Sequence, residues 1–350
     1  MKSEIDFFKH NGYMRFPKLL QIEITNRCPL SCPQCYKSPN GERDIDFGTL
    51  SKVMENAARC NVRYIMINGG EPLLYHKFAD FLHLIKEYNF EASCVTSGIG
   101  LTEELLSSIK NSGCYLQLNV SMNGSTEKVN SLSRDGYTHS IKAIELLCKN
   151  RFSYGINWVA RNDNIYDLPN LVKLAKSYNA GWVTIVTGKI DFEGRETSNL
   201  SQDDYIYLSG YIKQNEDSRF FMVQYCFPFL NSILYKNMNV HRNQCNAGIY
   251  SCCIDSDGKF SPCIHLNYKE DFDSIEEYWS KSEILRKIRN PEFGDFNDCK
   301  GCAARDSCRN CFCMDKENSD GLLLGFKKCP IKNIINKGDK DVEELQTIPV

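Results

Sequence analysis

Short apolar, β-branched runs alternate with longer segments of helical periodicity between residues 19 and 214. The short runs predict buried strands, and the longer segments predict amphipathic helices between them. The predicted strands are Leu20–Ile24, Arg63–Ile67, Ala92–Val95, Tyr115–Val120, Tyr154–Val159 and Trp182–Val186. The predicted helices are Thr49–Ala58, Lys77–Tyr88, Glu103–Asn111, Thr138–Asn150, Leu168–Tyr178 and Gln202–Gln214.

Six consecutive strand-helix units predict an α/β fold with a parallel sheet. Such a sheet is either open and doubly wound or part of a barrel. Helix start signals agree, because Thr102 and Asp167 are placed to cap helices and Pro169 suits a first turn. Further along, Ser274 and Glu277 have capping-box spacing and predict a helix that extends to about Ile288.

Polar and glycine residues follow every predicted strand. Because the carboxyl ends of parallel strands meet at one face of a barrel, these turns predict an active site at that face. The turns are the loop Cys28–Cys35, then Asn68–Pro72, Thr96–Gly98, Ser121–Gly124, Ala160–Asn162 and Thr187–Lys189.

The bulk composition is that of a globular protein. The chain has 350 residues, 42% of them apolar and 25% charged, enough for a sizeable core and for about two domains. A net charge of -2 without a basic stripe excludes nucleic acid as the main partner. The sequence has neither a secretory signal nor an apolar run of the ~18 residues that a spanning helix needs. We therefore expect a cytoplasmic protein with no membrane partner.

Cysteine usage is the anomaly in this composition. In a reducing compartment, 18 cysteines indicate metal ligation rather than disulfides. Eleven of them lie between Cys226 and Cys329. Four occur singly in apolar segments and are predicted to be small core residues, namely Cys60, Cys94, Cys114 and Cys148.

Cys28, Cys32 and Cys35 follow the first predicted strand with the spacing C-x3-C-x2-C. Three thiolates on a short loop can bind one metal centre but leave its fourth coordination position open. Taken alone, the three residues could also be a zinc knuckle or three free thiols.

The cysteine spacing, followed at once by Tyr36, resembles the signature of radical S-adenosylmethionine (radical SAM) enzymes. The resemblance covers about Leu19 to Gln214 and implies a partial (βα)6 TIM-like barrel. It also implies that the three cysteines hold a 4Fe-4S cluster whose open iron binds SAM. In that family the cluster cleaves SAM reductively to a 5'-deoxyadenosyl radical, which removes a hydrogen from the substrate.

The same resemblance implies a set of SAM contacts. Gly69, Gly70 and Glu71 are similar to the family's GGE motif, which receives the amino end of SAM. Without the family context, a Gly-Gly turn, a surface arginine or a core aromatic needs no function. The implied contacts are Tyr36 beside the adenine, Gly69, Gly70, Glu71, Ser97, Ser121 at the ribose and Arg134 at the carboxylate.

The later cysteines resemble the SPASM domain, an extension of radical SAM enzymes with one or two auxiliary 4Fe-4S clusters. Cys245 and Cys263 frame the pattern C-x12-G-x4-C, and the pattern C-x2-C-x5-C follows from Cys299. A zinc site remains the alternative, since two C-x2-C pairs also suit zinc. The resemblance implies one cluster on Cys299, Cys302, Cys308 and Cys329, and another on Cys245, Cys263 and either Cys313 or Cys311.

The sequence departs from the family at the last of these ligands. The expected spacing falls on Phe312, between Cys311 and Cys313, and we prefer Cys313. The fourth ligand of this cluster is Cys226, Cys252 or Cys253, or its position is open. We assign no catalytic acid, base or hydrogen donor. Cysteines left over from these sets are the candidates to quench a substrate radical.

These patterns predict an N-terminal extension (1–18), a radical SAM barrel (19–215), a SPASM domain (216–330) and a poorly ordered tail (331–350). The expected enzyme is an oxidoreductase that matures a ribosomally made peptide by crosslinking, thioether formation or epimerisation. Alternatives are a sulfatase-maturing or cofactor-precursor enzyme and, from another class, a non-catalytic Fe-S or zinc protein. Flavodoxin or ferredoxin would donate electrons. Because about 18 residues precede the first strand, a separate protein is one candidate to bind a leader peptide.

Overall fold

A computed structural model describes residues 4–38, 41–215, 220–234, 245–266, 268–290, 301–304, 311, 313 and 329–336. In this part of the chain, one sheet has the strand order β7-β6-β5-β4-β3-β2-β1-β8-β9. All neighbouring pairs are parallel except β8 and β9. The strands are β1 (Leu19–Thr25), β2 (Tyr64–Gly69), β3 (Glu91–Thr96), β4 (Tyr115–Ser121), β5 (Tyr154–Ala160), β6 (Trp182–Thr187), β7 (Phe221–Val223), β8 (Ser251–Ile254) and β9 (Phe260–Ser261).

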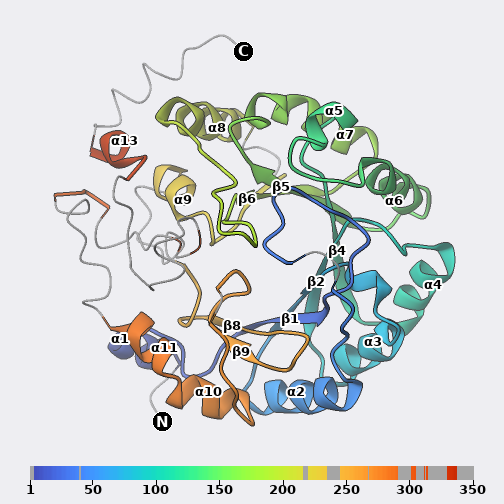
Figure 1. Ribbon diagram of the computed structural model, residues 1–350, viewed down its shortest axis with the longest axis vertical. Helices are drawn as coiled ribbons and strands as arrows, with labels where there is room; N and C mark the ends of the chain where they lie inside the picture. Colours follow the sequence, from blue (N-terminus) through green and yellow to red (C-terminus); the bar gives the residue numbers. More distant parts are fainter. Residues whose placement is uncertain are drawn as a thin grey trace.

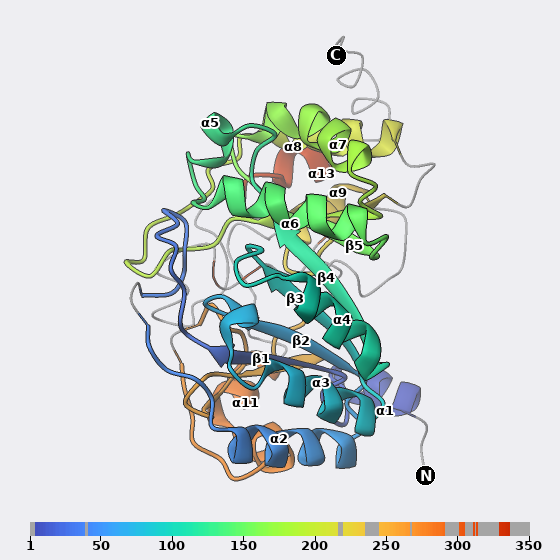
Figure 2. The ribbon, with the colours of Figure 1, turned by 90° about the vertical axis from the view of Figure 1, so that its right-hand side faces the viewer.

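Helices follow the outside of the curved sheet, from α2 to α8, as Figure 1 shows. Figure 2 shows α2, α3, α4 and α6 along one side of strands β1 to β5. Helices on one face of a curved parallel sheet make a partial barrel, not a doubly wound sheet. The helices are α1 (Glu4–Asn11), α2 (Phe47–Arg59), α3 (Phe78–Glu87), α4 (Glu103–Ser112), α5 (Glu127–Asn130), α6 (Tyr137–Lys149), α7 (Leu168–Ser177), α8 (Gln202–Gln214), α9 (Pro228–Leu234), α10 (Ile275–Lys281), α11 (Glu283–Arg289) and α13 (Lys332–Asn336), with short 3-10 turns at Pro72–Leu74 and Ile165–Asp167.

The predicted α/β barrel fold is confirmed, and all six predicted strands and six predicted helices are present within two residues of their predicted ends. Thr102 caps α4 by accepting a hydrogen bond from the Leu105 amide at 3.1 Å. Asp167 does not cap α7. Its carboxylate instead accepts hydrogen bonds from the backbone N–H and the hydroxyl of Ser125, at 2.6 and 2.8 Å, and joins two loops.

Two predictions for the C-terminal part need correction. The helix expected from Ser274 to Ile288 is divided at Ser282, whose hydroxyl caps α11. The predicted disordered tail 331–350 begins with helix α13, in which Ile334 and Ile335 are buried.

The sheet continues into the region after residue 215. Strand β8 pairs in parallel with β1, from Leu19 beside Ser251 to Ile22 beside Ile254. At the other end, β7 pairs in parallel with β6. Both edges of the six-stranded barrel are therefore extended by strands from the cysteine-rich part of the chain. None of the described helices combines the length and the apolar run that a membrane span requires.

The two faces of the sheet differ in polarity. Residues such as Leu20 and Ile22 are fully buried in the main hydrophobic core. Hydrogen-bonding side chains occupy the alternate positions and face a cavity. One level of this inner face runs through Gln21, Met66, Ser93 and Gln117, which are register partners on β1 to β4. A close-packed barrel would be filled by branched apolar residues at such positions, so this barrel keeps a polar interior open.

Two of the four single cysteines fit the prediction of small core residues. Cys60 and Cys94 are buried, whereas Cys114 and Cys148 are only half-buried.

Candidate active site

A cavity of about 310 Å³ lies at the carboxyl ends of the barrel strands. It gathers all three cysteines of the first loop and all seven residues predicted to contact SAM. These lining residues are Cys28, Cys32, Cys35, Tyr36, Gly69, Gly70, Glu71, Ser97, Ser121 and Arg134. Segments separated by about a hundred residues thus meet at one site because parallel strands end at the same edge.

The Gly69-Gly70 turn is docked on the start of the cysteine loop. Gly70 N–H donates to the Thr25 carbonyl at 2.8 Å, and Glu71 N–H donates to the Arg27 carbonyl at 2.7 Å. A Cβ at Gly70 would lie 2.2 Å from the Arg27 oxygen, and one at Gly69 would lie 2.3 Å from the Thr25 oxygen. Glycine is therefore required at both positions for the backbones to approach.

A second segment, Ser133–Gly136, holds the cysteine loop from another direction. Gln34 N–H donates to the Ser133 carbonyl at 3.2 Å. Leu30 packs on Gly136, where a Cβ would come within 2.9 Å of the leucine side chain. The carbonyl of Cys35 also accepts a hydrogen bond from Phe192 N–H at 3.0 Å. Contacts from three loops therefore fix the positions of the three thiols.

The thiols of this loop are protonated by default. Burial raises the pKa of Cys28 and of Cys35, while Arg134 opposes the shift at Cys35. A metal ligand must be a thiolate, so a bound cluster would displace these protons. Within the described ranges, no three His, Cys, Asp or Glu side chains converge as tightly as one metal ion requires. A four-iron cluster is wider than a single ion, and three thiols on one loop are the donor set that it takes.

Glu71 is 1% exposed and accepts four hydrogen bonds. The donors are the hydroxyls of Thr96 and Ser97, both at 2.5 Å, and the amides of Ser97 at 2.7 Å and Leu73 at 3.2 Å. Burial raises the pKa of Glu71, although these hydrogen bonds oppose the shift. The carboxylate therefore organises the turn after β3 besides lining the cavity.

Four buried polar atoms around the cavity have no hydrogen-bond partner in the part of the chain that the structure describes. Buried polar groups are almost always paired, so unpaired ones indicate a polar ligand. Ser121 and Arg134 were predicted from the sequence; Gln34 and His265 were not. Gln34 lies between two cysteines and His265 follows Cys263 by two residues, which is the only sequence signal for either. The four atoms are Gln34 Oε1, Ser121 Oγ, Arg134 Nε and His265 Nδ1.

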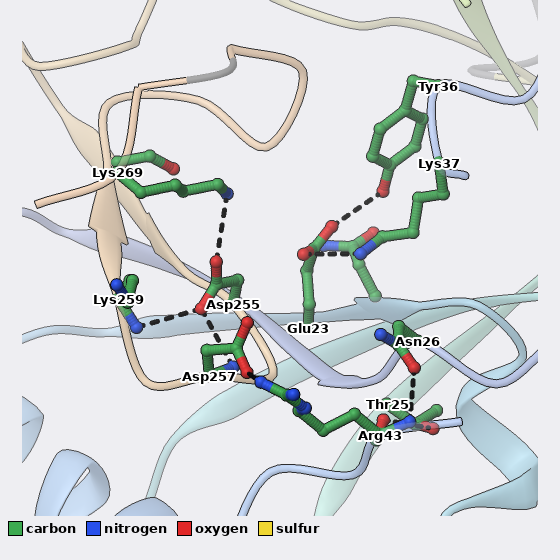
Figure 3. A network of polar contacts seen from close by, with 12 residues as sticks. Glu23, Thr25, Asn26, Tyr36, Lys37, Arg43, Asp255, Asp257, Lys259 and Lys269 are labelled. Carbon is green, nitrogen blue, oxygen red and sulfur yellow. Dashed lines mark hydrogen bonds and ion pairs between the residues drawn. The ribbon is translucent and has the colours of Figure 1, made fainter. Parts of the chain in front are cut away.

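Tyr36 connects the cysteine loop to the C-terminal part of the chain. Its hydroxyl donates to Glu23 at 3.1 Å, and Lys37 forms an ion pair with the same carboxylate at 2.6 Å (Figure 3). The Tyr36 ring packs edge-on against His265, with centroids 4.2 Å apart. Burial, followed by the charge of Glu23, raises the pKa of Tyr36 well above its ordinary value.

The β8-β9 turn is joined to the loop that follows the cysteines. Arg43 forms an ion pair with Asp257 in this turn, and Lys269 forms one with Asp255 at 3.4 Å (Figure 3). The loop that carries the three cysteines is thus attached to the cysteine-rich region on two sides.

A second group of sulfurs lies beside the cavity. The thiol of Cys313 is in hydrogen-bond contact with Cys263 and Cys311, and Cys226 lies close to Cys311 and Cys263. Cys245 belongs to the same small cluster of buried side chains. The residues predicted to hold one auxiliary cluster therefore lie together, and Cys226 lines the cavity itself.

Strand β8 separates the remaining candidates for that cluster. Cys253 is buried and lies near Cys263, whereas Cys252 is fully buried in the main core, near Cys60. Alternation along a strand puts these neighbours on opposite faces. Cys252 is therefore not placed to act as the fourth ligand.

The cluster predicted on Cys299, Cys302, Cys308 and Cys329 is only partly visible. Cys302 and Cys329 both pack against the main core. Cys299 and Cys308 lie outside the described residues.

The barrel and its cavity match known proteins. Residues 22–175 match the model of the radical SAM superfamily. PqqA peptide cyclase of Gluconobacter oxydans is 28% identical over 175 residues, which are 48% of this chain and 49% of that protein. This alignment thus spans about half of each chain. AdoMet-dependent heme synthase of Methanosarcina barkeri is 24% identical over 327 residues, covering 84% of this chain and 91% of that protein.

Among solved structures, Streptococcus suis SuiB bound to S-adenosylmethionine has a TM-score of 0.73 at 18% identity. The superposition covers 88% of this chain and 76% of SuiB. SuiB bound to its precursor peptide SuiA gives a TM-score of 0.72 at 17% identity, with 88% and 75% of the two chains covered. The likeness shows that the two chains share a fold.

Proposed function

Because residues 22–175 belong to the radical SAM superfamily, we propose that this chain modifies a ribosomally made peptide with SAM and a 4Fe-4S cluster. The observation that carries the proposal is the cavity in which Cys28, Cys32 and Cys35 meet the unpaired Ser121 and Arg134. When bound, the cluster and SAM supply a 5'-deoxyadenosyl radical, which removes a hydrogen from the substrate.

The residues of the chain bind and orient SAM. Arg134 is suited to the SAM carboxylate because a guanidinium pairs with a carboxylate through two parallel hydrogen bonds. Ser121 offers its unpaired hydroxyl to a ribose, and the Gly69-Gly70 turn lies against the cysteine loop. The half-buried Tyr36 closes the cavity on the side of the adenine. Exclusion of water protects a reactive intermediate, which is the task that remains for the protein.

The size of the cavity favours a peptide. At about 310 Å³ it is at the low end of the range for one drug-sized ligand. With SAM bound, the remaining room suits a side chain of an extended segment better than a macrocycle. PqqA peptide cyclase, by its name, acts on a peptide, and SuiB was solved with a precursor peptide, which supports the same substrate class.

The alternative is an enzyme for a cofactor precursor. It is favoured by the heme synthase alignment, which spans most of both chains. A sulfatase-maturing activity and a non-catalytic Fe-S protein are weaker alternatives, since no observed feature favours either.

We further propose that residues 216–330 form a SPASM domain with at least one auxiliary 4Fe-4S cluster at Cys245, Cys263, Cys311 and Cys313, with Cys226 or Cys253 nearby. A second cluster would use Cys299, Cys302, Cys308 and Cys329. The enzyme would work in the cytoplasm with flavodoxin or ferredoxin as electron donor. A separate protein could present the leader peptide.

Coexpression tests the substrate class. A short peptide encoded beside the gene is coexpressed with the wild-type chain or with Cys32→Ala and analysed by mass spectrometry. A mass change that requires Cys32 supports a peptide maturase. An unmodified peptide, together with turnover of a small metabolite by the reconstituted enzyme, would favour the cofactor-precursor alternative.

A further inference from the structure

Lys189 is a buried lysine whose partners are not carboxylates. It follows β6, is 6% exposed, and lines the cavity. Its ammonium donates hydrogen bonds to the Cys311 sulfur at 3.1 Å and to the Cys226 carbonyl at 2.8 Å. Among the described residues, no Asp or Glu forms an ion pair with it.

A buried ammonium needs a nearby negative charge. Without one, burial would drive the group to its neutral form. Burial does oppose protonation of Lys189, but the nearby Cys226, Cys311 and Cys313 outweigh it and raise its pKa. Neutral thiols do not supply this charge, whereas thiolates on iron do. The surroundings of Lys189 therefore fit an anionic sulfur site.

The segment around Lys189 also fixes the backbone of the second cysteine group. Ile190 N–H donates to the Cys313 carbonyl at 2.9 Å. The hydroxyl of Thr197 in turn donates to the Lys189 carbonyl. The end of β6 thus contacts both the sulfur of Cys311 and the main chain of Cys313. These contacts join the cavity wall to the cysteine group.

We propose that Lys189 is a positioning residue of the auxiliary cluster, holding the Cys311 sulfur at the cavity wall and raising the reduction potential of that cluster. The inference rests on the proposed auxiliary cluster. Reduction adds one negative charge to a cluster, and a cation that donates a hydrogen bond to its sulfur stabilises the reduced form. The sequence preference for Cys313 is thereby replaced by Cys311 as the ligand on the side of the cavity.

The test is a redox titration followed by electron paramagnetic resonance, with iron counted in each sample. Cys28, Cys32 and Cys35 are replaced by Ala in every sample, so that only auxiliary iron remains. In this background Lys189→Met removes the charge and the donors, and Lys189→Arg keeps both. Lys259→Met is the control, because Lys259 pairs at the surface with Asp271 at 3.5 Å.

With Lys189→Met, one auxiliary signal should move to lower potential. At the wild-type midpoint, its reduced-to-oxidised ratio should fall on the order of tenfold, the effect of one charge-assisted hydrogen bond. Lys189→Arg and Lys259→Met should stay close to wild type. Loss of auxiliary iron in Lys189→Met with retention in Lys189→Arg would also support the proposal.

An unchanged potential in iron-loaded Lys189→Met would overturn the proposal, as would loss of iron in both Lys189 variants. If the parent triple variant binds no auxiliary iron, the proposed auxiliary cluster itself fails. Formation of 5'-deoxyadenosine by the chain with Cys28, Cys32 and Cys35 intact would then still test the radical SAM activity separately.

Discussion

Ser97 donates two hydrogen bonds to Glu71, one from its backbone N–H at 2.7 Å and one from its hydroxyl at 2.5 Å. Thr96 donates a third, to the other carboxylate oxygen, at 2.5 Å. Because Glu71 follows β2 and Ser97 follows β3, the buried carboxylate ties the ends of two strands together at the cavity wall.

Ser97→Ala should weaken both the fold and SAM binding. Removing the hydroxyl leaves a buried carboxylate with fewer donors, which costs about 1 to 3 kcal/mol. Urea unfolding and SAM titration of the reconstituted protein measure the two effects. Ser107→Ala is the control, since this exposed hydroxyl donates only to a carbonyl of its own helix. Equal behaviour of the two variants would contradict the role given to Ser97.

Gly70→Ala should lower iron loading. The added Cβ would collide with the Arg27 carbonyl, and the collision would displace the start of the cysteine loop. Gly181→Ala is a matched control, because its Cβ would meet the Tyr154 carbonyl at 3.5 Å, an ordinary contact. Iron and sulfide per chain after anaerobic reconstitution are compared. Full loading of Gly70→Ala would show that the turn does not position the thiols.

Arg134→Met should raise the Kd for SAM by about tenfold or more while leaving iron content unchanged, because a bidentate carboxylate partner is lost. Arg134→Lys should be intermediate, since an ammonium keeps the charge but not the planar pair of donors. Arg43→Met, at an exposed ion pair with Asp257, serves as the control. An unchanged Kd in Arg134→Met would exclude this arginine from the SAM site.

Asp191 makes the cysteine loop sensitive to acid. It is 5% exposed and accepts hydrogen bonds from the amides of Glu193 and Arg195 and from the Arg195 guanidinium, and its loop donates Phe192 N–H to Cys35. Burial raises the pKa of Asp191, but the hydrogen bonds from Arg195 outweigh it, so the pKa is lowered. The stabilisation is therefore present above the ordinary pKa of 3.8 and is lost as pH falls through the lowered value.

Asp191→Asn should thus lose about 1 kcal/mol at neutral pH, a low figure because Arg195 is exposed. The difference from wild type should vanish in acid. Urea unfolding between pH 7 and pH 2 measures both, and a difference that does not depend on pH would contradict the assignment to the carboxylate.

The barrel and the first site could be predicted because their signals are local. Each strand-helix unit has its own periodicity, and Cys28, Glu71 and Arg134 meet once the strands are known to be parallel. The second sulfur group could not be predicted in this way. Strands β7 and β8 are short and depend on pairing with β6 and β1, and Lys189 meets Cys311 across 122 positions of sequence.

The capping errors have a similar cause. Asp167 has the sequence signal of a helix cap, yet its carboxylate is taken by Ser125, 42 positions earlier. A distant partner competed with the local one, and no local pattern records that competition.

Formation of 5'-deoxyadenosine tests the central claim most directly. The chain is purified and reconstituted without oxygen, then incubated with SAM and dithionite, and the products are quantified by liquid chromatography. The wild-type chain should bind iron and release 5'-deoxyadenosine, whereas Cys32→Ala should release none. A wild-type chain that is loaded with iron but leaves SAM intact, or a Cys32→Ala variant as active as wild type, would contradict the account.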